Sequence, residues 1–369
     1  MAHILTFNAG SSSLRTALYR VENGRAAVTW QDHRNQPPEQ LEARLADILA
    51  GIPEPADAVA HRVVHGGPRQ WRPVRITPEV EADIEQACTL APLHNPHALN
   101  LLRQVRGQLD PRLPHIACFD TGFYHELPVV ASTYALPGAL SREHGLRRYG
   151  FHGLAHQSML AGLSACHDGQ PPSRIITLQL GGGCSVTASH DGRALDTSMG
   201  FTPLEGLMMR TRCGDLDPGL MFYLKRRTGC SDSELESLLN HDSGLRGVSE
   251  LSGDMKTLLE TDSEPARLAV ELFCYRVRKY IGAYAAVLGG VDAIVFGGGV
   301  GEHAAPVRER ILAPLDWLGV RLDREVNATA QREHRRISAD DSGIEAWVIP
   351  VDEGALMAQQ AAGLLTRGS

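Results

Sequence analysis

The sequence predicts an α/β protein with two related lobes, and two observations lead to this prediction. An apolar, strand-like run, a turn of small residues and a second strand-like run open the chain, and the same pattern recurs in outline near residue 180. Alternating helix-like and strand-like segments follow each copy, as in sheets covered by helices. The length of 369 residues allows roughly two to three domains. The repeated pattern therefore predicts two lobes of similar build.

The first copy occupies the start of the chain. Apolar runs over 4–7 and 14–19 predict paired strands around a turn of small residues, and Asn23-Gly24 marks a further hairpin. The stretch "AVAHRVVHGG" reads as a buried strand that stops at two glycines. The other elements predicted in this half are helices over 38–50, 78–90 and 97–106 and a strand over 115–123.

The second copy begins after "CHDGQPPSR", a polar stretch rich in turn-forming residues. A strand over 174–180, the turn "GGGCS" and a strand over 186–189 repeat the opening pattern. The turn "HDGR" then leads into a strand over 194–198, and apolar residues near the 3.6-residue period predict a long helix over 264–288. The remaining elements predicted are strands over 292–303 and 346–354 and helices over 307–318 and 355–365.

The composition argues against nucleic acids and membranes as partners. Hydrophobic residues make up 43% of the chain and charged residues 21%, as in a globular protein with a substantial core. The formal net charge of -7 offers no broad basic surface of the kind that nucleic acids or anionic lipids bind. A small anionic substrate would therefore need arginines placed locally around its site.

The cysteines and the first residues predict a cytoplasmic protein. The seven cysteines are widely spaced and form no C-x-x-C pair, as expected for free thiols in a reducing compartment. The first residues show no basic region followed by a long apolar stretch, and no window approaches about 18 uninterrupted apolar residues. These patterns favour neither secretion nor membrane insertion.

Three turns of small residues follow apolar strands and are candidate phosphate sites. They read "NAGSSS", "GGGCS" and "GGGVGEH". Glycine lets backbone N–H groups approach a ligand closely, and hydroxyl groups add donors, so such turns suit phosphate. They match neither the P-loop nor the G-x-G-x-x-G dinucleotide pattern. A tight connection without a ligand remains the alternative for each turn.

Histidine, arginine and aspartate side chains gather at the predicted strand ends between these turns. The candidates are His61, Arg62, His65, His94, Asp120, His152, His156, Asp196, Arg210, Arg212, Asp215 and Asp217. Any one of them could be an ordinary core or surface group, but their clustering beside Gly and Pro favours function. The spacing lacks the zinc motif H-E-x-x-H. Mg²⁺ held by Asp120 or Glu353 together with substrate phosphates fits better.

In these motifs the chain resembles the acetate kinase family, the short-chain carboxylate kinases in the superfamily of acetate and sugar kinases, heat-shock 70 proteins and actin. The matching stretches span nearly the whole chain: "FNAGSSSLR", "HRVVHGG", "LAPLHNP", "FDTGFYHELP", "RYGFHG", "DTSMGFTPLEGLMMRTRCGDLDPG", "FGGGVGEH" and "VIPVDEG". The resemblance implies two actin-like (ribonuclease H-like) lobes with mixed sheets and an active-site cleft between them. Residues 1–150, joined by a C-terminal helix over 354–369, would form one lobe, and 151–353 the nucleotide-binding other.

The resemblance also implies a reaction. Members of the family convert ATP and acetate reversibly into ADP and acetyl phosphate by direct in-line transfer with Mg²⁺ or Mn²⁺, and usually form homodimers. No general base is needed, because a carboxylate is already ionised near neutral pH. By resemblance, Arg62 and Arg212 would bind the carboxylate and the transferring phosphoryl group, and His152 would hydrogen-bond that group. Asp120 would align the metal or the nucleophile, and His94 would support the acyl-phosphate end.

The remaining site residues are likewise implied by the resemblance. Glu353 would hold the metal, with Asn8 ordering its waters or contacting phosphate and Asp120 as a further ligand. The positions facing the phosphates would be Asn8, Ser11, Ser12, Arg15, Gly181, Gly182, Gly183, Gly298, Gly299 and Gly301. The small apolar acyl pocket would be lined by Val64, Leu93, Phe151 and Pro203. Such a pocket discriminates one methylene by only about 1 to 3 kcal/mol, so propionate is a possible substrate beside acetate.

The sequence departs from the family pattern mainly on the side of the phosphoryl donor. The positions that differ are Arg15, Leu154, Ala155, Gln179, Gly182, Arg210, His303, Asp352 and Gly354. Gly182 stands where the family has asparagine, and a lost bond to phosphate is worth about 1.5 to 3 kcal/mol. Three alternatives therefore stay open: a propionate or butyrate kinase, an enzyme that uses pyrophosphate, and a weakened, nucleotide-binding regulatory protein. A sugar kinase or an ATP-driven chaperone fits the His and Arg cluster less well.

Overall fold

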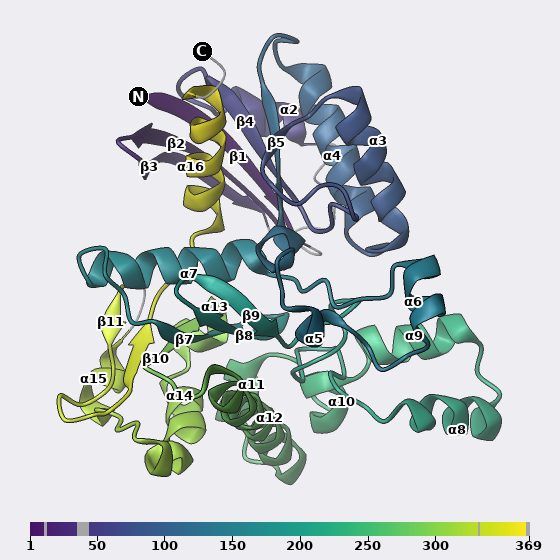
Figure 1. Ribbon diagram of the computed structural model, residues 1–369, viewed down its shortest axis with the longest axis vertical. Coiled ribbons are helices and arrows are strands. Elements are labelled where there is room, and N and C mark those ends of the chain that lie inside the picture. Colours follow the sequence, from purple (N-terminus) through teal and green to yellow (C-terminus); the bar gives the residue numbers. More distant parts are fainter. Residues whose placement is uncertain (11–12, 35–43, 331–332, 367–369) are drawn as a thin grey trace. The chain divides into compact units, whose positions relative to one another are not determined.

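The computed structural model describes residues 1–10, 13–34, 44–330 and 333–366, and the chain divides into two compact units. The first unit contains Met1–His125, Phe151–Ser158 and Asp352–Ser369. The second contains Glu126–Gly150 and Met159–Val351. Each unit is built around one mixed sheet with helices packed on it (Figure 1).

The sheet of the first unit has the strand order β3-β2-β1-β4-β6-β5. Its strands are β1 (Ala2–Ala9), β2 (Leu14–Glu22), β3 (Arg25–Arg34), β4 (Ala58–Val63), β5 (Val74–Arg75) and β6 (His115–Phe119). Asn23 and Gly24 both have positive φ, 49° and 75°, which suits the two-residue hairpin turn between β2 and β3. The predicted hairpins at the start of the chain are therefore present.

Helices cover both faces of this sheet. Their bounds are α2 (Leu45–Ala50), α3 (Pro78–Gln86), α4 (Asn95–Gln108) and α16 (Glu353–Thr366), with 3-10 turns η1 (Ala87–Thr89) and η2 (Asp120–Tyr124). One core cluster joins apolar residues of β1, β2, β4 and β6 to Met357 and Ala361 of α16. A second cluster joins the other face to Ile48 of α2 and Val105 of α4. The polar ends of β1, β4 and β6 are thus held by a packed core.

The sheet of the second unit has the strand order β11-β12-β10-β7-β8-β9. Its strands are β7 (Arg174–Leu180), β8 (Cys184–His190), β9 (Arg193–Thr197), β10 (Ala293–Gly297), β11 (Arg335–Arg336) and β12 (Glu345–Val348). The helices are α5 (Val129–Ser132), α6 (Gly138–His144), α8 (Pro218–Thr228), α9 (Asp232–His241), α10 (Gly244–Ser249), α11 (Met255–Glu260), α12 (Glu264–Leu288), α13 (Gly298–His303), α14 (Ala305–Leu312), η3 (Ala313–Leu318) and α15 (Arg324–Thr329). The long helix α12 packs on β7, β8 and β9.

The two sheets share one pairing scheme. In the first, β1 pairs antiparallel with β2 and parallel with β4, which pairs parallel with β6. In the second, β7 pairs antiparallel with β8 and parallel with β10, which pairs parallel with β12. A two-residue antiparallel strand closes one edge of each sheet. The duplication predicted from the two strand-turn-strand units is therefore confirmed at the level of topology.

Several elements differ from the sequence-based expectations. Helix α2 covers only the end of the helix expected over 38–50, and residues 38–43 lie outside the described part. Helix α7 (Gly153–Cys166) was not among the elements expected from the sequence. The division of the chain also differs from the expected boundary at 150, since Glu126–Gly150 belongs to the second unit. The reason is that this segment pairs with residues such as Gly200, whose carbonyl accepts from the N–H of Tyr149.

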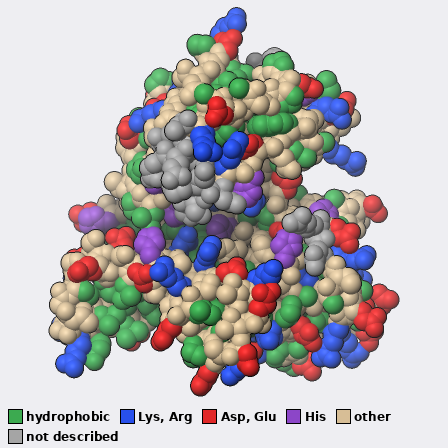
Figure 2. Space-filling model, turned by 180° about the vertical axis from the view of Figure 1, so that it is seen from behind, with side chains coloured by type: hydrophobic (Ala, Val, Ile, Leu, Met, Phe, Trp, Pro, Cys, Tyr) green, Lys and Arg blue, Asp and Glu red, His purple; other side chains and the backbone are tan. Residues whose placement is uncertain are grey.

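The described surface is mixed in charge. On the face drawn in Figure 2, Lys and Arg side chains are interspersed with Asp and Glu side chains over both units. Among the described helices, none combines the length and the apolar character needed to cross a membrane.

Candidate active site

The first unit holds a buried ion pair at the ends of β4 and β6. The two strands run parallel, and Arg62 of β4 lies opposite Cys118 of β6. Asp120 comes directly after the last residue of β6, so Arg62 and Asp120 lie at the same edge of the sheet. Nη2 of Arg62 lies 2.5 Å from Oδ2 of Asp120, and Nε lies 3.1 Å from the same oxygen. The two side chains are only 12% and 1% exposed. Their geometry is therefore fixed largely away from water.

Asn8 and Glu353 extend this pair into a chain of four polar side chains. Nη1 of Arg62 donates to Oδ1 of Asn8 at 3.2 Å. Nδ2 of Asn8 donates to Oε2 of Glu353 at 2.5 Å, across 345 positions of sequence. Asn8 lies near the end of β1, and Glu353 is the first residue of α16. The structure thus brings the predicted metal residues Asn8, Asp120 and Glu353 around one arginine.

Burial and the neighbouring charges shift the pKa values of Arg62 and Asp120 in this network of four side chains. Burial alone would lower the pKa of Arg62, but the carboxylates of Asp120 and Glu353 outweigh it and raise the pKa. Burial raises the pKa of Asp120, while Arg62 and a hydrogen bond from the Leu154 N–H oppose that rise. Arg62 therefore keeps its positive charge throughout the physiological pH range, as an anion-binding group must.

The segment that leads into α7 is packed against Asp120. A Cβ at Gly153 would lie 2.1 Å from the carbonyl oxygen of Asp120, so only glycine allows this approach. His152 has a φ of 60°, in the left-handed region. Phe151 is 1% exposed and packs edge-on against His65, with ring centroids 5.9 Å apart. The predicted residues His152 and Phe151 therefore lie in the same part of the first unit as Asp120.

Val64, Leu93 and His94 lie near the start of α4. Oδ1 of Asn95 accepts from the backbone N–H of His65 at 3.0 Å, and Nδ2 donates to the His65 carbonyl at 2.7 Å. These bonds tie the end of β4 to the beginning of α4, where His94 is the N-terminal flanking residue. Val64 is buried at 5% exposure, whereas Leu93 is 42% exposed. Of the three predicted pocket residues in the first unit, Val64 and Phe151 are therefore buried and Leu93 is exposed.

Of the residues predicted to bind phosphate around the first turn, the structure describes Asn8 and Arg15 but not Ser11 and Ser12. Arg15 lies directly opposite Asn8 in the antiparallel pairing of β1 and β2, and its side chain is exposed. Ser11 and Ser12 lie outside the described residues. The N–H of Gly10 donates to the carbonyl of Ser13 at 2.8 Å, which closes this turn.

The second unit places Gly181, Gly182 and Gly183 in the turn between β7 and β8. The N–H of Gly181 donates to the carbonyl of Gly183 at 3.1 Å, and the Gly182 carbonyl accepts from the N–H of Arg210 at 3.2 Å. A Cβ at Gly182 would meet nothing within 4 Å, so the space for a larger side chain is open there. The loop that carries Arg210 and Arg212 is thus joined directly to the predicted phosphate turn.

Arg212 is half-buried and has no carboxylate partner among the described residues. Its Nη1 donates to the carbonyl of Pro203 at 3.0 Å and contacts Sδ of Met209 at 3.6 Å. Burial lowers the pKa of Arg212, and the Cys184 thiol opposes this weakly. A half-buried guanidinium whose neighbours are neutral acceptors gains much from an incoming anion.

Gly298, Gly299 and Gly301 lie in α13, where the sequence suggested a turn at the end of a strand; that expectation is wrong. Gly298 begins the helix with a φ of 74°, and a Cβ there would lie 2.7 Å from the Leu180 carbonyl. Its N–H donates to Oε1 of Glu302 at 3.0 Å. That donor is therefore already occupied by the chain's own carboxylate, while a Cβ at Gly299 would meet nothing within 4 Å. His303 ends the helix.

Arg308 fixes the far end of α13, a role that no sequence pattern indicated. It is fully buried, and Nη1 donates to the carbonyls of Gly301 and Glu302 at 2.8 and 2.9 Å. Nε donates to Oδ1 of Asn327 at 2.7 Å. Burial lowers the pKa of Arg308 to about 10. A charged side chain with five donors thus satisfies carbonyls that a six-residue helix leaves free.

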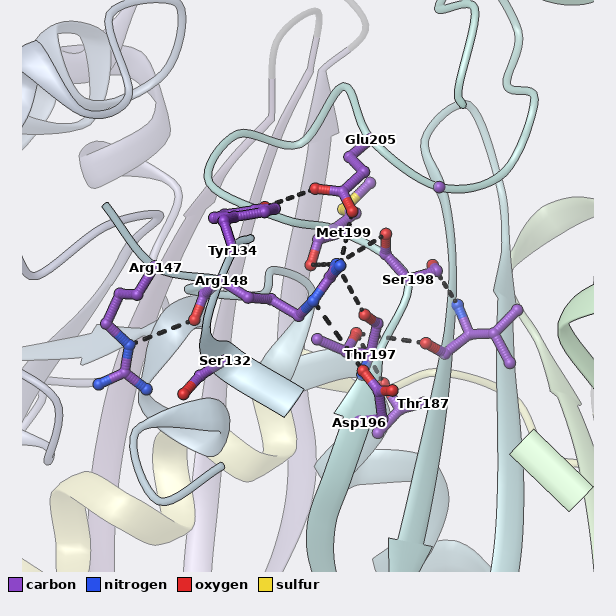
Figure 3. A network of polar contacts seen from close by, with 12 residues as sticks. Ser132, Tyr134, Arg147, Arg148, Thr187, Asp196, Thr197, Ser198, Met199 and Glu205 are labelled. Carbon is purple, nitrogen blue, oxygen red and sulfur yellow. Dashed lines mark hydrogen bonds and ion pairs between the residues drawn. The ribbon is translucent and has the colours of Figure 1, made fainter. Parts of the chain in front are cut away.

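A second arginine network holds the loop that carries Pro203 (Figure 3). Nη1 of Arg148 donates to the carbonyls of Thr197 and Met199, both at 3.0 Å. Its Nη2 lies 2.5 Å from Oε1 of Glu205, whose Oε2 accepts from the Tyr134 hydroxyl at 2.5 Å. The Pro203 carbonyl in turn accepts from Arg212. Arg148 and Glu205 lie inside the motifs singled out above, but only the structure shows that they act together.

The residues of the first unit fit a magnesium ion that is held mostly through water and phosphate. No group of three or more His, Cys, Asp or Glu side chains among the described residues could enclose a metal. Mg²⁺ needs only one or two carboxylates when waters and phosphates complete its octahedron. Glu353 offers one oxygen beyond that used by Asn8, and Asp120 is engaged by Arg62. Glu353 would therefore suit the role of direct ligand better than Asp120 would, and Asn8 would fix the orientation of the Glu353 carboxylate.

The predicted residues fall into two sets, one in each unit. The first unit contains Asn8, Arg15, Arg62, Val64, Leu93, His94, Asp120, Phe151, His152 and Glu353. The second unit contains Gly181, Gly182, Gly183, Pro203, Arg212, Gly298, Gly299 and Gly301.

Comparisons with known proteins give these sets a family. The model of the Acetokinase family matches residues 39–359. An acetate kinase of Rhodopseudomonas palustris is 42% identical over 391 residues, which cover 96% of each chain. The crystal structure of Porphyromonas gingivalis acetate kinase matches with a TM-score of 0.86 at 34% identity and covers 100% of both chains. A propionate kinase from Francisella tularensis matches with a TM-score of 0.87 at 34% identity, covering 98% of this chain and 99% of that chain. The family and the two-lobed α/β fold predicted from the sequence are confirmed: the chain belongs to the acetokinase family.

Proposed function

We propose that the protein transfers the terminal phosphoryl group of ATP to the carboxylate of acetate, reversibly giving acetyl phosphate and ADP. One carboxylate oxygen forms the new bond to phosphorus as the bond to the ADP oxygen breaks. The observation that carries the proposal is the chain from Asp120 through Arg62 and Asn8 to Glu353. It holds a permanently charged guanidinium beside a candidate metal carboxylate. That combination suits a reaction in which three anionic oxygens must be bound and oriented.

Arg62 serves in this proposal as the fixed anion binder of the first unit. Its Nε and Nη2 donate to Asp120, and these bonds fix the orientation of the guanidinium toward the bound anion. Arg212 serves as the anion binder of the second unit, because its half-buried charge has only neutral acceptors among the described residues. Two arginines of this kind neutralise the equatorial oxygens while the phosphoryl group moves. His152 and His94 are proposed to hydrogen-bond the phosphoryl group and the acyl-phosphate end.

Glu353 is the proposed magnesium ligand, with Asn8 and Asp120 ordering the surrounding waters. Mg²⁺, when bound, neutralises charge on the phosphate oxygens. Asn8 holds the Glu353 carboxylate through a short hydrogen bond, which fixes its orientation. Mn²⁺ prefers the same oxygen ligands and is a plausible substitute in an assay.

The second unit is proposed to bind the nucleotide through the turn of Gly181, Gly182 and Gly183 and through α13. Open space at Gly182 and Gly299 supports close approach of a ligand to this backbone. The missing side chain at Gly182 and the engaged N–H of Gly298 leave fewer donors for the phosphates. GTP and pyrophosphate should also be tested as phosphoryl donors, because fewer N–H groups are left for the phosphates of ATP.

The acyl pocket is proposed to consist of Val64, Leu93, Phe151 and Pro203. Phe151 and Val64 are buried, which limits the space for a longer chain. A pocket of this kind separates acetate from propionate by about 1 to 3 kcal/mol. A structural neighbour described as a propionate kinase supports testing both acids.

A homodimer in the cytoplasm completes the proposal. Exposed apolar residues on α8, with Phe222 63% and Tyr223 55% exposed, support an interface on the second unit. The free thiols among the described residues support a reducing compartment. Light scattering on a size-exclusion column would give the mass of the assembly, and a monomer at working concentrations would reject the dimer.

A hydroxamate-trapping assay tests the function. Acetate, propionate and butyrate are crossed with ATP, GTP and pyrophosphate in the presence of Mg²⁺, and acyl phosphate is trapped as the hydroxamate. The proposal expects the highest rate with ATP and acetate. Tight nucleotide binding without acyl phosphate from any acid would instead favour a regulatory protein. Phosphorylation of a sugar would point to a different kinase.

A further inference from the structure

A cavity of about 570 Å³ lies in the first unit, at the opposite end of the sheet from Arg62 and Asp120. Its walls come from the end of β5, the start of α3, the last turns of α4 and the 110–114 loop, and His115 of β6 lies at its floor. Figure 1 shows α3 and α4 side by side next to β5. The volume is in the range of ordinary small-molecule sites.

The lining of this cavity is positively charged. Four arginines contribute to it, Arg75, Arg103, Arg106 and Arg112, against two acidic residues, Glu81 and Asp110. Four positive and two negative charges give a local excess of two, although the whole chain has a formal net charge of -7. Such a local reversal of sign concentrates anions where the overall field does not.

The available acids do not saturate these arginines. Glu81 is shared, with Oε1 2.7 Å from Nε of Arg103 and Oε2 2.8 Å from Nη1 of Arg106. The exposed side chain of Arg75, a residue whose backbone pairs with β6, makes no hydrogen bond or ion pair with any residue in the described ranges. Because each guanidinium has five N–H donors, Arg75 and Arg106 keep donors free for a ligand.

The floor of the cavity is rigid, neutral and partly apolar. Nδ1 of His115 lies 2.8 Å from Nε2 of His61, and both imidazoles are buried. Burial and the charge of Arg106 lower the pKa of His115 to about 4, so the ring is neutral at pH 7. Ile76 and Leu113 add apolar surface beside it. The cavity thus offers charge at its rim and a surface for a carbon skeleton below.

This cavity is separate from the candidate active site. His115 begins β6 and Asp120 follows its last residue, so the two lie five steps of extended chain apart, about 17 Å. The parallel strand β4 carries Arg62 toward the same end as Asp120. A ligand in the cavity therefore does not contact Arg62, Asp120 or Glu353.

We propose that this cavity binds a small organic dianion, a phosphate monoester or a dicarboxylate with a compact apolar body. Arg75 and Arg106 bind the two charges through their free N–H donors, and Ile76 and Leu113 contact the carbon skeleton. A dianion matches the local charge excess of two, whereas acetate carries one charge. The site goes beyond the proposed phosphoryl transfer and does not depend on it.

Calorimetric titration with three test compounds that share one ring examines the proposal. Phenyl phosphate is the monoester, phthalate the dicarboxylate and benzoate the monoanion. The protein is compared with the double variant Arg75→Gln/Arg106→Gln and with Arg20→Gln/Arg25→Gln. The control removes the same two charges from exposed positions of β2 and β3. Melting temperatures confirm that each variant folds.

The expected result is binding of at least one dianion that the Arg75→Gln/Arg106→Gln variant weakens tenfold or more and the control leaves within twofold. Binding of phenyl phosphate alone assigns the site to phosphate esters, and binding of phthalate alone to dicarboxylates. Equal binding of benzoate, equal losses in both variants, or no binding at all would overturn the proposal. Acyl phosphate formation is followed separately, so its absence in the unmodified protein would reject the proposed function without affecting this result.

Discussion

Arg62 and Asp120 form a buried ion pair across two neighbouring parallel strands, with Nη2 2.5 Å from Oδ2 and the aspartate side chain 1% exposed. The pair has two consequences that can be separated. It fixes the orientation of a charged guanidinium, and it places two charges where neither is stable alone. Removing one partner should therefore affect both activity and folding.

Arg62→Ala should lower kcat by about 10³ or more, because an arginine that stabilises a moving phosphoryl group contributes on that scale. It should also lower the free energy of unfolding by about 3 to 5 kcal/mol, because Asp120 is left buried without its partner. Urea denaturation and the hydroxamate assay measure the two effects.

The double variant Arg62→Ala/Asp120→Ala is the control for the first prediction. It removes both charges, so most of the stability should return while kcat stays low. A recovery of activity together with stability would show that Arg62 only supports the fold.

Arg212→Ala should reduce kcat by about 10³ with little loss of stability. The reason is that the side chain has only the Pro203 carbonyl and the Met209 sulfur as partners among the described groups, so no buried carboxylate is orphaned. Arg246→Ala, at a side chain that is 59% exposed, is the matched control and should keep full activity. An unchanged kcat in Arg212→Ala would remove this residue from the mechanism.

Arg148→Met should destabilise the second unit by several kcal/mol and lower kcat as well. The substitution leaves Glu205 without its cation and frees the carbonyls of Thr197 and Met199. Tyr134→Phe removes a single hydroxyl from the same network and should cost about 1 kcal/mol. Thermal and urea unfolding rank the two variants, and a larger effect of Tyr134→Phe would contradict this picture.

Glu353→Gln should raise the Mg²⁺ concentration needed for half-maximal activity by about 10- to 100-fold, since loss of a group that holds or orients the metal costs this much. The amide can still accept the hydrogen bond from Asn8, so the fold should be kept. Glu264→Gln changes the first residue of α12 in the same way and should not alter the Mg²⁺ dependence. Equal curves for Glu353→Gln and the unmodified protein would exclude the metal role.

Stability should fall as the pH is lowered from about 6.5 towards 4. Burial lowers the pKa of His115 to about 4, and it also lowers the pKa of His61 well below its ordinary value. In this window the unfolded chain binds protons that the folded protein does not, so acid favours unfolding. Above pH 6.5 both states carry neutral imidazoles at these positions, and the contribution to stability is complete.

His115→Gln tests this pH dependence, because the amide can still bond to His61 but does not titrate. Its unfolding free energy should vary less between pH 6.5 and 4 than that of the unmodified protein. Urea denaturation at several pH values gives both curves, and parallel curves would contradict the assignment.

The local sequence pattern determined some of the regular elements. The strand over 174–180 and the helix over 264–288 have the bounds that their apolar periods predict, because periodicity reflects which face of an element is buried. The motifs also sufficed to predict the family. Helix α13 was not predicted, because its glycines indicate a turn. Its carbonyls are satisfied by Arg308 of a later helix, a contact that no local pattern shows.

Only the tertiary structure decided which candidates meet. Asn8 and Glu353 are 345 positions apart, and no local pattern specifies that the Asn8 amide will donate to the Glu353 carboxylate. The pairing of Arg62 with Asp120 depends on the register of two parallel strands, since a shift by one residue would turn the side chain to the other face. Propensity and periodicity act over a few residues, whereas the contacts that orient Arg62 and offset the burial of its charge are set by the packing of the whole unit.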